Sequence, residues 1–156
     1  MPESRLVAVA LGSNLGDRAA HLRHAVTRLR QTLTGLRVST FMETEPEGVS
    51  PQPAFLNGAV VGESAGRPFD LLGILQDLEG ERQRARPFPG AARTLDLDLI
   101  LVGDCVESSA RIALPHPRFR ERLFVLRPLA EIAPEMIDPL TGQSITTLLE
   151  RAARRR

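Results

Sequence analysis

The stretch RTLDLDLILVGD, residues 93–104, has the period of a β-strand but carries two carboxylates. Leucines occupy every second position from 95 to 101, and the other positions hold Asp96, Asp98, Ile100 and Val102 in turn. Side chains two residues apart share one face of a strand, so the leucines predict the core side. A carboxylate among apolar residues is costly unless it is paired. We therefore expect the second face to line an open cleft at the aspartates and to be covered beyond them.

Asp96 and Asp98 are the first candidates for chemistry. Two adjacent carboxylates repel each other, and a nearby cation relieves that repulsion. Magnesium is a fitting cation, because it is commonly held by one or two carboxylates together with substrate phosphates. A solvent-facing strand edge with arginines nearby is the alternative, and an isolated Asp-x-Asp leaves it open.

The segment before this strand, GERQRARPFPGAAR at residues 80–93, is rich in arginine. Arg82, Arg84, Arg86 and Arg93 are opposed there by Glu81 alone. Arginines beside a magnesium site would neutralise and align a polyphosphate, which is what phosphoryl transfer requires. A solvated surface loop is the alternative for the same residues.

The segment after the strand, LPHPRFRER at residues 114–122, places His116 rigidly between two prolines. Arg118, Arg120 and Arg122 follow at every second position. This arrangement favours contact with phosphate, since arginine forks bind phosphate oxygens in a bidentate way. A structural histidine is the alternative.

A second pocket is indicated by Phe55 and Asn57, which share a face of an expected strand and follow a proline-rich turn containing Thr44. An aromatic ring and an amide suit a flat heterocycle, because one stacks and the other reads donors and acceptors. Phe124 is a candidate for the second stacking face. The alternative is that Phe55 and Phe124 are core residues.

The hydrophobic pattern predicts a β-α-β-β-α-β order. The strand at 6–11 is apolar on both faces, which is typical of a central strand. Helices are expected at about 15–33, ended by Gly35, and from Pro68 to Gly80, with strands at 36–42 and 55–61. Further helices are expected at about 123–132 and 144–154. The fold class is therefore α+β: a ferredoxin-like antiparallel sheet with two helices on one face, plus a C-terminal helical and loop extension.

Composition narrows the class of protein. The 156 residues suit one domain, expected over 1–156, and the net charge of +1 gives no reason to expect nucleic acid or a membrane as partner. The chain has no lysine, which excludes a P-loop and Schiff-base chemistry. The single cysteine, Cys105, forbids an internal disulfide and fits a cytoplasmic location.

Four segments together resemble one known family: ALGSNLGDR, TEPEGVSPQPAFLNGAV, RTLDLDLILVGD and LPHPRFRERLFVLRPLAEIAP, in this order and with fitting gaps. Over nearly its whole length the chain resembles the hydroxymethyl-dihydropterin pyrophosphokinases of folate biosynthesis. The resemblance implies a magnesium-dependent diphosphotransferase that transfers pyrophosphate from ATP to the hydroxymethyl group of 6-hydroxymethyl-7,8-dihydropterin and releases AMP. The expected partners are these two small molecules, and the expected state is a monomer or a weak homodimer.

The resemblance also implies site residues. Two Mg²⁺ ions would bind Asp96 and Asp98, and these aspartates with Arg84 and Arg93 would form the catalytic set. The residues around ATP would be Gln76, Glu79, Arg84, Arg93, Leu99, Arg111, His116 and Arg122. The residues around the pterin would be Thr44, Phe55, Asn57 and Phe124. The sequence PGAART at 89–94 departs from the Trp or Asn that the family often carries before its Arg-Thr.

Three other functions remain as alternatives. An RNA-binding module shares this strand and helix order, but it should show a basic stripe and paired aromatic residues on the central strands. A metabolite-sensing domain would bind a ligand without consuming ATP. A third alternative keeps the catalyst and changes the acceptor to another hydroxymethyl heterocycle.

Overall fold

The computed structural model describes residues 3–45, 53–82 and 94–155, and its elements alternate between strands and helices in the first two thirds of the chain. The strands are β1 (Arg5–Ser13), β2 (Thr34–Val38), β3 (Met42–Thr44), β4 (Phe55–Ser64), β5 (Asp96–Val102), β6 (Glu107–Ser108) and β7 (Ala113–Leu114). The helices are α1 (Arg18–Thr32), α2 (Pro68–Glu81), the 3₁₀ turn η1 (Phe119–Glu121), α3 (Leu123–Ile132) and α4 (Ile145–Arg154).

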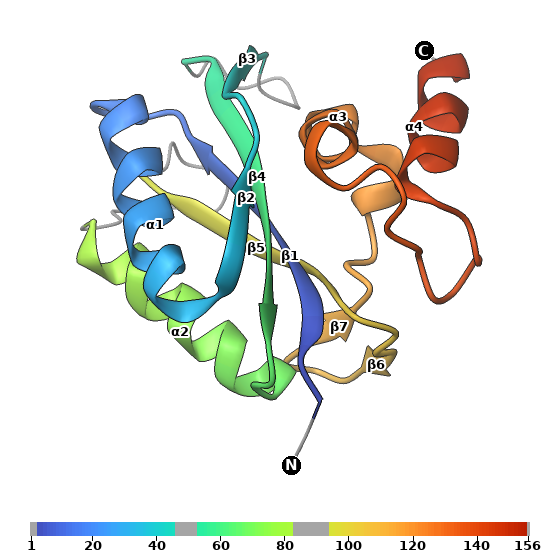
Figure 1. The fold of residues 1–156 in the computed structure, drawn as a ribbon. Coiled ribbons are helices and arrows are strands. Elements are labelled where there is room, and N and C mark those ends of the chain that lie inside the picture. Colours follow the sequence, from blue (N-terminus) through green and yellow to red (C-terminus); the bar gives the residue numbers. More distant parts are fainter. Residues whose placement is uncertain (1–2, 46–52, 83–93, 156) are drawn as a thin grey trace.

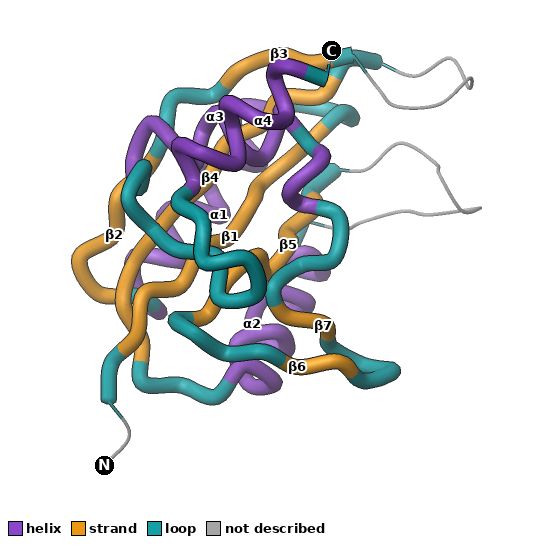
Figure 2. Tube along the Cα trace, turned by 90° about the vertical axis from the view of Figure 1, so that its right-hand side faces the viewer, coloured by secondary structure: helices purple, strands orange, loops and turns teal. Residues whose placement is uncertain are grey.

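The main sheet is antiparallel and has the order β2-β4-β1-β5, with β3 paired to β4. Helices α1 and α2 cover one face, and α3 and α4 lie on the other (Figure 1). In Figure 2 the second pair lies in front of the sheet and the first pair behind it. The expected central position of β1 is confirmed, because its side chains are buried in both hydrophobic clusters.

Alternate residues of β1 belong to different hydrophobic clusters, one on each face of the sheet. Val7, Val9 and Leu11 pack with the leucines of α1 and α2, whereas Ala8 and Ala10 face α3 and α4. The expected helices at 123–132 and 144–154 match α3 and α4, and Ser144 caps α4 by accepting a hydrogen bond from the Thr147 N–H at 3.2 Å.

The alternation predicted along β5 is wrong for its last two residues. β5 pairs with β1 as Val9 with Leu99 but Ala8 with Leu101, so Ile100 is an additional residue in the ladder. Leu101 therefore joins Ile100 in the α3/α4 cluster, and Val102 turns to the α1/α2 side. A β-bulge of this kind bends a strand and reverses its facing, which no period-two pattern reveals.

The expected helix ends also need correction. α1 ends at Thr32 and Leu33 is already extended, while Gly35 adopts φ 60° inside β2 and does not cap the helix. α2 begins at Pro68 as expected but runs through Gly80 to Glu81. The strand expected at 36–42 is divided into β2 and β3. Within the described ranges, no helix is both long and apolar enough to cross a membrane.

Candidate active site

The chemistry-bearing side chains of β4 and β5 lie in the same register rows of the sheet. Gly12 pairs with Asn57 on one side and with Asp96 on the other, and Ala10 pairs likewise with Ala59 and Asp98. Residues paired in this way project from the same face. Because neighbouring strands lie about 4.8 Å apart, the backbones of Asn57 and Asp96 are about 10 Å apart.

Gly12 leaves the middle of this row without a side chain. A Cβ at that position would lie 3.3 Å from Asn57 Oδ1 and 3.6 Å from Phe55 Cδ1. The glycine therefore forms a low floor between the amide side and the carboxylate side. The sequence analysis gave Gly12 no role of its own, although an isolated glycine inside a strand often marks a close approach by a backbone or ligand.

Asp96 and Asp98 are half-buried, whereas Ile100 and Leu101 beyond them are fully covered. The prediction that this face changes from open to covered along β5 is therefore confirmed. Within residues 3–45, 53–82 and 94–155, no three His, Cys, Asp or Glu side chains form a metal-binding group. Two carboxylates alone suit magnesium, which takes its remaining oxygen ligands from substrate and water.

Two residues expected at the ATP site attach to the outer edge of β5, Glu79 through its side chain and His116 through its backbone. Since β5 ends the strand order, its outward backbone groups need partners from outside the sheet. Buried Glu79 of α2 accepts a hydrogen bond from the Leu97 N–H at 2.8 Å, and the His116 N–H donates to the Ile100 carbonyl at 2.9 Å. Together they hold the strand on either side of Asp98.

The imidazole of His116 has a defined tautomer. Its Nδ1 accepts a hydrogen bond from the Arg118 N–H at 3.2 Å, so the neutral ring carries its proton on Nε2. Burial lowers the pKa of His116, the charges of Arg122 and Arg118 lower it further, and Asp96 opposes them. His116 is therefore a neutral donor at physiological pH, and Asp96 and Arg122 lie within electrostatic range of it.

The three arginines after His116 do not act alike. The guanidinium of Arg122 lies 5.5 Å from the ring centre of Phe124, which is half-buried at the start of α3. Arg120 instead forms an ion pair with the fully buried Asp138. The interpretation of Arg120 as a phosphate contact is therefore not supported, because its charge is already neutralised inside the protein.

Three of the four residues expected around the pterin, Thr44, Phe55 and Asn57, lie close to one another. Asn57 is 6% exposed and its Nδ2 donates to Thr44 Oγ1, while Thr44 pairs with Phe55 in the sheet. Phe124 also packs against the cluster on the α3/α4 face. The amide of Asn57 is thus oriented by a hydroxyl, and its Oδ1 faces the floor at Gly12.

The motif GSNLGDR supports this pocket, a role that the sequence analysis missed. Asn14 is buried and donates to the Pro53 carbonyl at 3.3 Å, and Arg18 donates to the Ala54 carbonyl at 2.9 Å. Both bonds hold the chain just before Phe55. Asp17 caps α1 by accepting from the Ala20 N–H at 3.1 Å, as expected of a turn that starts a helix.

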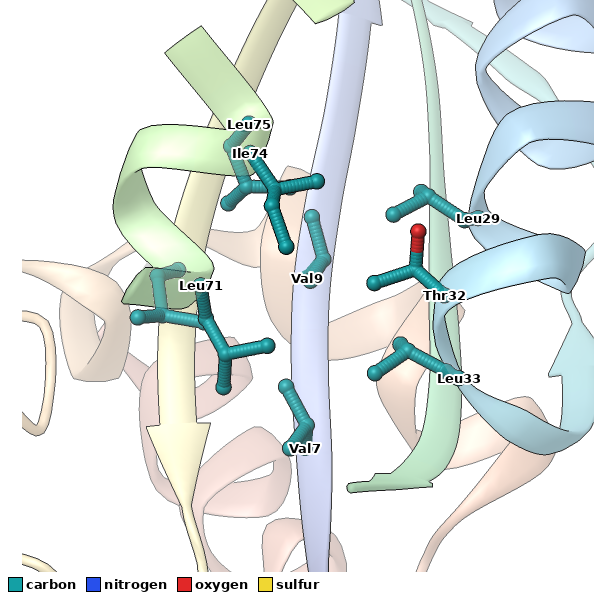
Figure 3. Close-up of a pocket in the computed structure, with 9 residues that line it drawn as sticks. Val7, Val9, Leu29, Thr32, Leu33, Leu71, Ile74 and Leu75 are labelled. Atoms are coloured by element: carbon teal, nitrogen blue, oxygen red, sulfur yellow. The ribbon is translucent and has the colours of Figure 1, made fainter. Parts of the chain in front are cut away.

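Three further residues expected around ATP have defined surroundings in the structure. Gln76 is exposed on α2, and Arg111 stacks over Phe69 at 5.3 Å, about 15 Å along α2 from Glu79 by the rise of a helix. The side chain of Leu99 belongs to the cluster on the opposite face and lines an apolar cleft there. Figure 3 shows this cleft with side chains of α1, α2 and β1 around it. Arg84 and Arg93 are outside the described residues.

Comparisons with known proteins give a consistent result. Residues 8–134 match the family described as 7,8-dihydro-6-hydroxymethylpterin-pyrophosphokinase. The chain is 42% identical over 141 residues to the 2-amino-4-hydroxy-6-hydroxymethyldihydropteridine pyrophosphokinase of Bacillus subtilis, covering 89% of this chain and 84% of that protein. It is 35% identical over 152 residues to the folic acid synthesis protein fol1 of Schizosaccharomyces pombe, covering 96% of this chain and 21% of that protein.

A solved structure shares the fold. The crystal structure of Plasmodium falciparum HPPK-DHPS with pteroate superposes with a TM-score of 0.77 at 12% identity. The match covers 99% of this chain and 45% of that chain.

Proposed function

The chain belongs to the 7,8-dihydro-6-hydroxymethylpterin-pyrophosphokinase family, and on this premise we propose which of its residues carry out the reaction. It is a pyrophosphokinase of folate synthesis. The observation that carries the assignment of residues is the row Asn57–Gly12–Asp96, which joins a heterocycle-binding amide to a metal-binding carboxylate across an open floor.

Asp96 and Asp98 hold two Mg²⁺ ions together with the phosphates of ATP. The donor set supports this, since both carboxylates are half-buried on one face and magnesium needs few protein ligands. When bound, the ions supply charge neutralisation of the triphosphate and lower the pKa of the acceptor hydroxyl. Glu79 and His116 fix the strand between them, and so set the positions of the carboxylates.

The ATP side of the site is formed by His116 and Arg122, together with Gln76, Glu79, Leu99 and Arg111. The Nε2–H of His116 donates to a phosphate oxygen, and Arg122 adds positive charge to the same region. Arg84 and Arg93 are proposed as phosphate contacts on the resemblance alone. Because the Leu99 side chain faces the helices, its contribution is through its backbone.

The pterin lies between Phe55 and Phe124, with Asn57 and Thr44 reading its ring edge. Asn57 suits this role because its amide is held by Thr44 and buried among apolar residues. The hydroxymethyl arm then extends across Gly12 toward the carboxylates. The acceptor oxygen attacks the β-phosphorus of ATP, the Pα–O–Pβ bridge breaks, and AMP leaves as the hydroxyl loses its proton.

Several coarser properties are part of the same proposal. The strand order β2-β4-β1-β5 supports the ferredoxin-like core, with α3 and α4 as its C-terminal extension. We also propose one catalytic domain over 1–156, a cytoplasmic location, and a monomer or weak homodimer. The RNA-binding alternative is not favoured, because β1 presents only Ala8, Ala10 and Gly12 on the face where such modules stack bases.

The decisive experiment mixes the protein with ATP, MgCl₂ and 6-hydroxymethyl-7,8-dihydropterin and separates the nucleotides by chromatography. AMP and the pterin diphosphate should appear in equal amounts, and omission of the pterin should abolish both. Formation of ADP in place of AMP would contradict transfer of a two-phosphate unit. An equally fast reaction with another hydroxymethyl heterocycle would contradict the assignment of the acceptor.

A further inference from the structure

The segment between His116 and Arg122 is a weak element on its own. η1 spans Phe119–Glu121, and its turns are closed by hydrogen bonds of 3.4, 3.1 and 3.2 Å. A 3₁₀ turn of this length has poor hydrogen-bond geometry and little intrinsic stability. The two ATP-site residues at its ends therefore depend on other contacts for their positions.

Asp138 supplies such a contact from the loop between α3 and α4. Its carboxylate has no exposed surface, and Oδ2 accepts from Arg120 Nε at 2.5 Å while Oδ1 accepts from Arg120 Nη2 at 3.0 Å. A side-on, bidentate pair of this kind fixes both the position and the orientation of the guanidinium. Arg120 lies at the centre of η1.

The loop that carries Asp138 is itself held firmly. Thr141 Oγ1 donates to Oδ2 at 2.8 Å and the Leu140 N–H donates to Oδ1 at 3.1 Å. The backbone closes on itself as well, since the Asp138 N–H donates to the Gln143 carbonyl at 2.9 Å and the Gly142 N–H donates to the Asp138 carbonyl at 2.8 Å. The carboxylate is thus the fixed partner, and Arg120 is the group that it holds.

Arg120 is also fixed from its other side. Its guanidinium lies 4.9 Å from the ring centre of Phe119, which is completely buried in the α3/α4 cluster. A well-packed apolar pair could stabilise such a contact about as well as a buried ion pair does. What the ion pair adds is direction: it holds the guanidinium of Arg120 on the buried Asp138, whereas His116 lies within electrostatic range of Arg122 and Asp96.

We propose that Asp138 is a positioning residue that acts through Arg120 to set the placement of His116 and Arg122 at the ATP site. This inference rests on the proposed function for the identity of the nucleotide. It goes beyond that function because it gives a role to the Arg120–Asp138 pair, which the assignment of substrate contacts does not include. Loss of the pair should therefore weaken ATP binding more than pterin binding, because Thr44, Phe55 and Asn57 of the pterin side lie on β3 and β4 and only Phe124 follows Arg122 on α3.

The test compares Arg120→Met, Arg120→Lys and Asp138→Asn with the control Arg127→Met, which removes an exposed charge from α3. Steady-state AMP formation gives kcat and the KM of each substrate. Titration calorimetry with α,β-methylene-ATP and MgCl₂ gives nucleotide affinity without turnover, and urea denaturation gives stability. Arg120 is partly exposed, so its variants remain informative even where Asp138→Asn folds poorly.

Arg120→Met and Asp138→Asn should raise the KM for ATP and the Kd of the analogue about tenfold, while the KM for the pterin rises clearly less. Arg120→Lys should recover part of the loss, because an ammonium replaces one of the two hydrogen bonds. A lower urea midpoint with unchanged ATP binding, or equal rises in both KM values, overturns the proposal. If the wild-type protein binds the analogue but forms no AMP, the proposed pyrophosphate transfer is wrong. The Kd values of the variants and of wild type then still test the positioning role of Asp138. If the wild-type protein does not bind the analogue, the proposed function and the positioning role of Asp138 are both overturned.

Discussion

Asn57 and Asp96 stand on opposite sides of Gly12 in one register row, with their side chains on the same face of the sheet. This relationship links two strands whose chemistry would otherwise be separate, since β4 and β5 are not neighbours. The distance between them, about two strand spacings or about 10 Å, matches a small heterocycle with a one-carbon arm. The central strand β1 therefore contributes to the site because Gly12 has no side chain and leaves space between Asn57 and Asp96.

The first prediction concerns Gly12. In Gly12→Ala the new methyl group would lie 3.3 Å from Asn57 Oδ1, so either the amide or the strand must shift. We expect the KM for the pterin to rise about tenfold, as for a misplaced binding group, while the KM for ATP changes little. Steady-state kinetics with each substrate varied in turn measures both values.

Gly73→Ala is the matched control, because a Cβ at that helical position meets no atom within 4 Å. It should preserve both KM values and stabilise α2 by about 0.5–1 kcal/mol. A pterin KM that is unchanged in Gly12→Ala would show that the floor of the row does not contact the substrate.

The second prediction concerns the two carboxylates. Asp96→Ala and Asp98→Ala should each reduce kcat at least about 100-fold, since metal-assisted charge stabilisation is worth several kcal/mol. Chelation of Mg²⁺ with EDTA should abolish the wild-type activity, and added MgCl₂ should restore it. Asp104→Ala removes an exposed carboxylate just beyond β5 and should have no effect. If either variant keeps the wild-type kcat at the MgCl₂ concentration used for wild type, the metal assignment is refuted.

The third prediction concerns the support of β5 by α2. Glu79→Ala leaves the Leu97 N–H at the sheet edge without its carboxylate acceptor, and such a loss costs about 1–3 kcal/mol. Glu79→Gln retains an amide oxygen at that place and should cost less. Urea denaturation of both variants, with Asp77→Ala on the exposed side of α2 as control, measures the difference. Equal losses for Ala and Gln would mean that packing, and not the hydrogen bond, holds the strand.

The aspartates and the central strand were predictable because they depend on local periodicity. Leucine at every second position predicts a buried face, so the intruding carboxylates of β5 stand out, and a strand apolar on both faces predicts a central place. The bulge at Ile100 was not predictable, since it depends on how β5 is paired with β1. The end of α1 was mispredicted because Gly35 is needed for a positive φ in β2 and not for a helix cap.

Within the site, sequence patterns did not predict the contacts between segments that are far apart in the chain. Arg120 and Asp138 are 18 residues apart, and neither lies in a motif that indicates the other. A regular series of arginines after His116 predicted uniform phosphate contacts, but only burial reveals that one of them is neutralised inside the protein. The contacts of Asn14 and Arg18 were not predicted, because nothing in their own segment shows that Pro53 and Ala54 lie beside them.

The last prediction is the pH dependence of stability at Asp138. Burial alone would raise the pKa of this carboxyl, but the hydrogen bonds from Arg120, Thr141 and the Leu140 N–H outweigh it and hold the pKa below its ordinary value. In the unfolded chain an aspartate titrates near about 3.9, so on acidification the unfolded state takes up the proton first. The stabilisation is therefore present above that value and is lost as the pH falls through the lower pKa of the folded state.

Asp138→Asn removes this titration. Its free energy of unfolding should lie below that of wild type at neutral pH, and the difference between the two should narrow as the pH falls below about 4. Urea denaturation at a series of pH values measures both curves, and Asp77→Asn, an exposed substitution, should follow the wild-type curve in parallel. A gap that stays constant down to the acid limit would mean that Asp138 stabilises the fold through shape and hydrogen bonding alone, and that its charge contributes nothing.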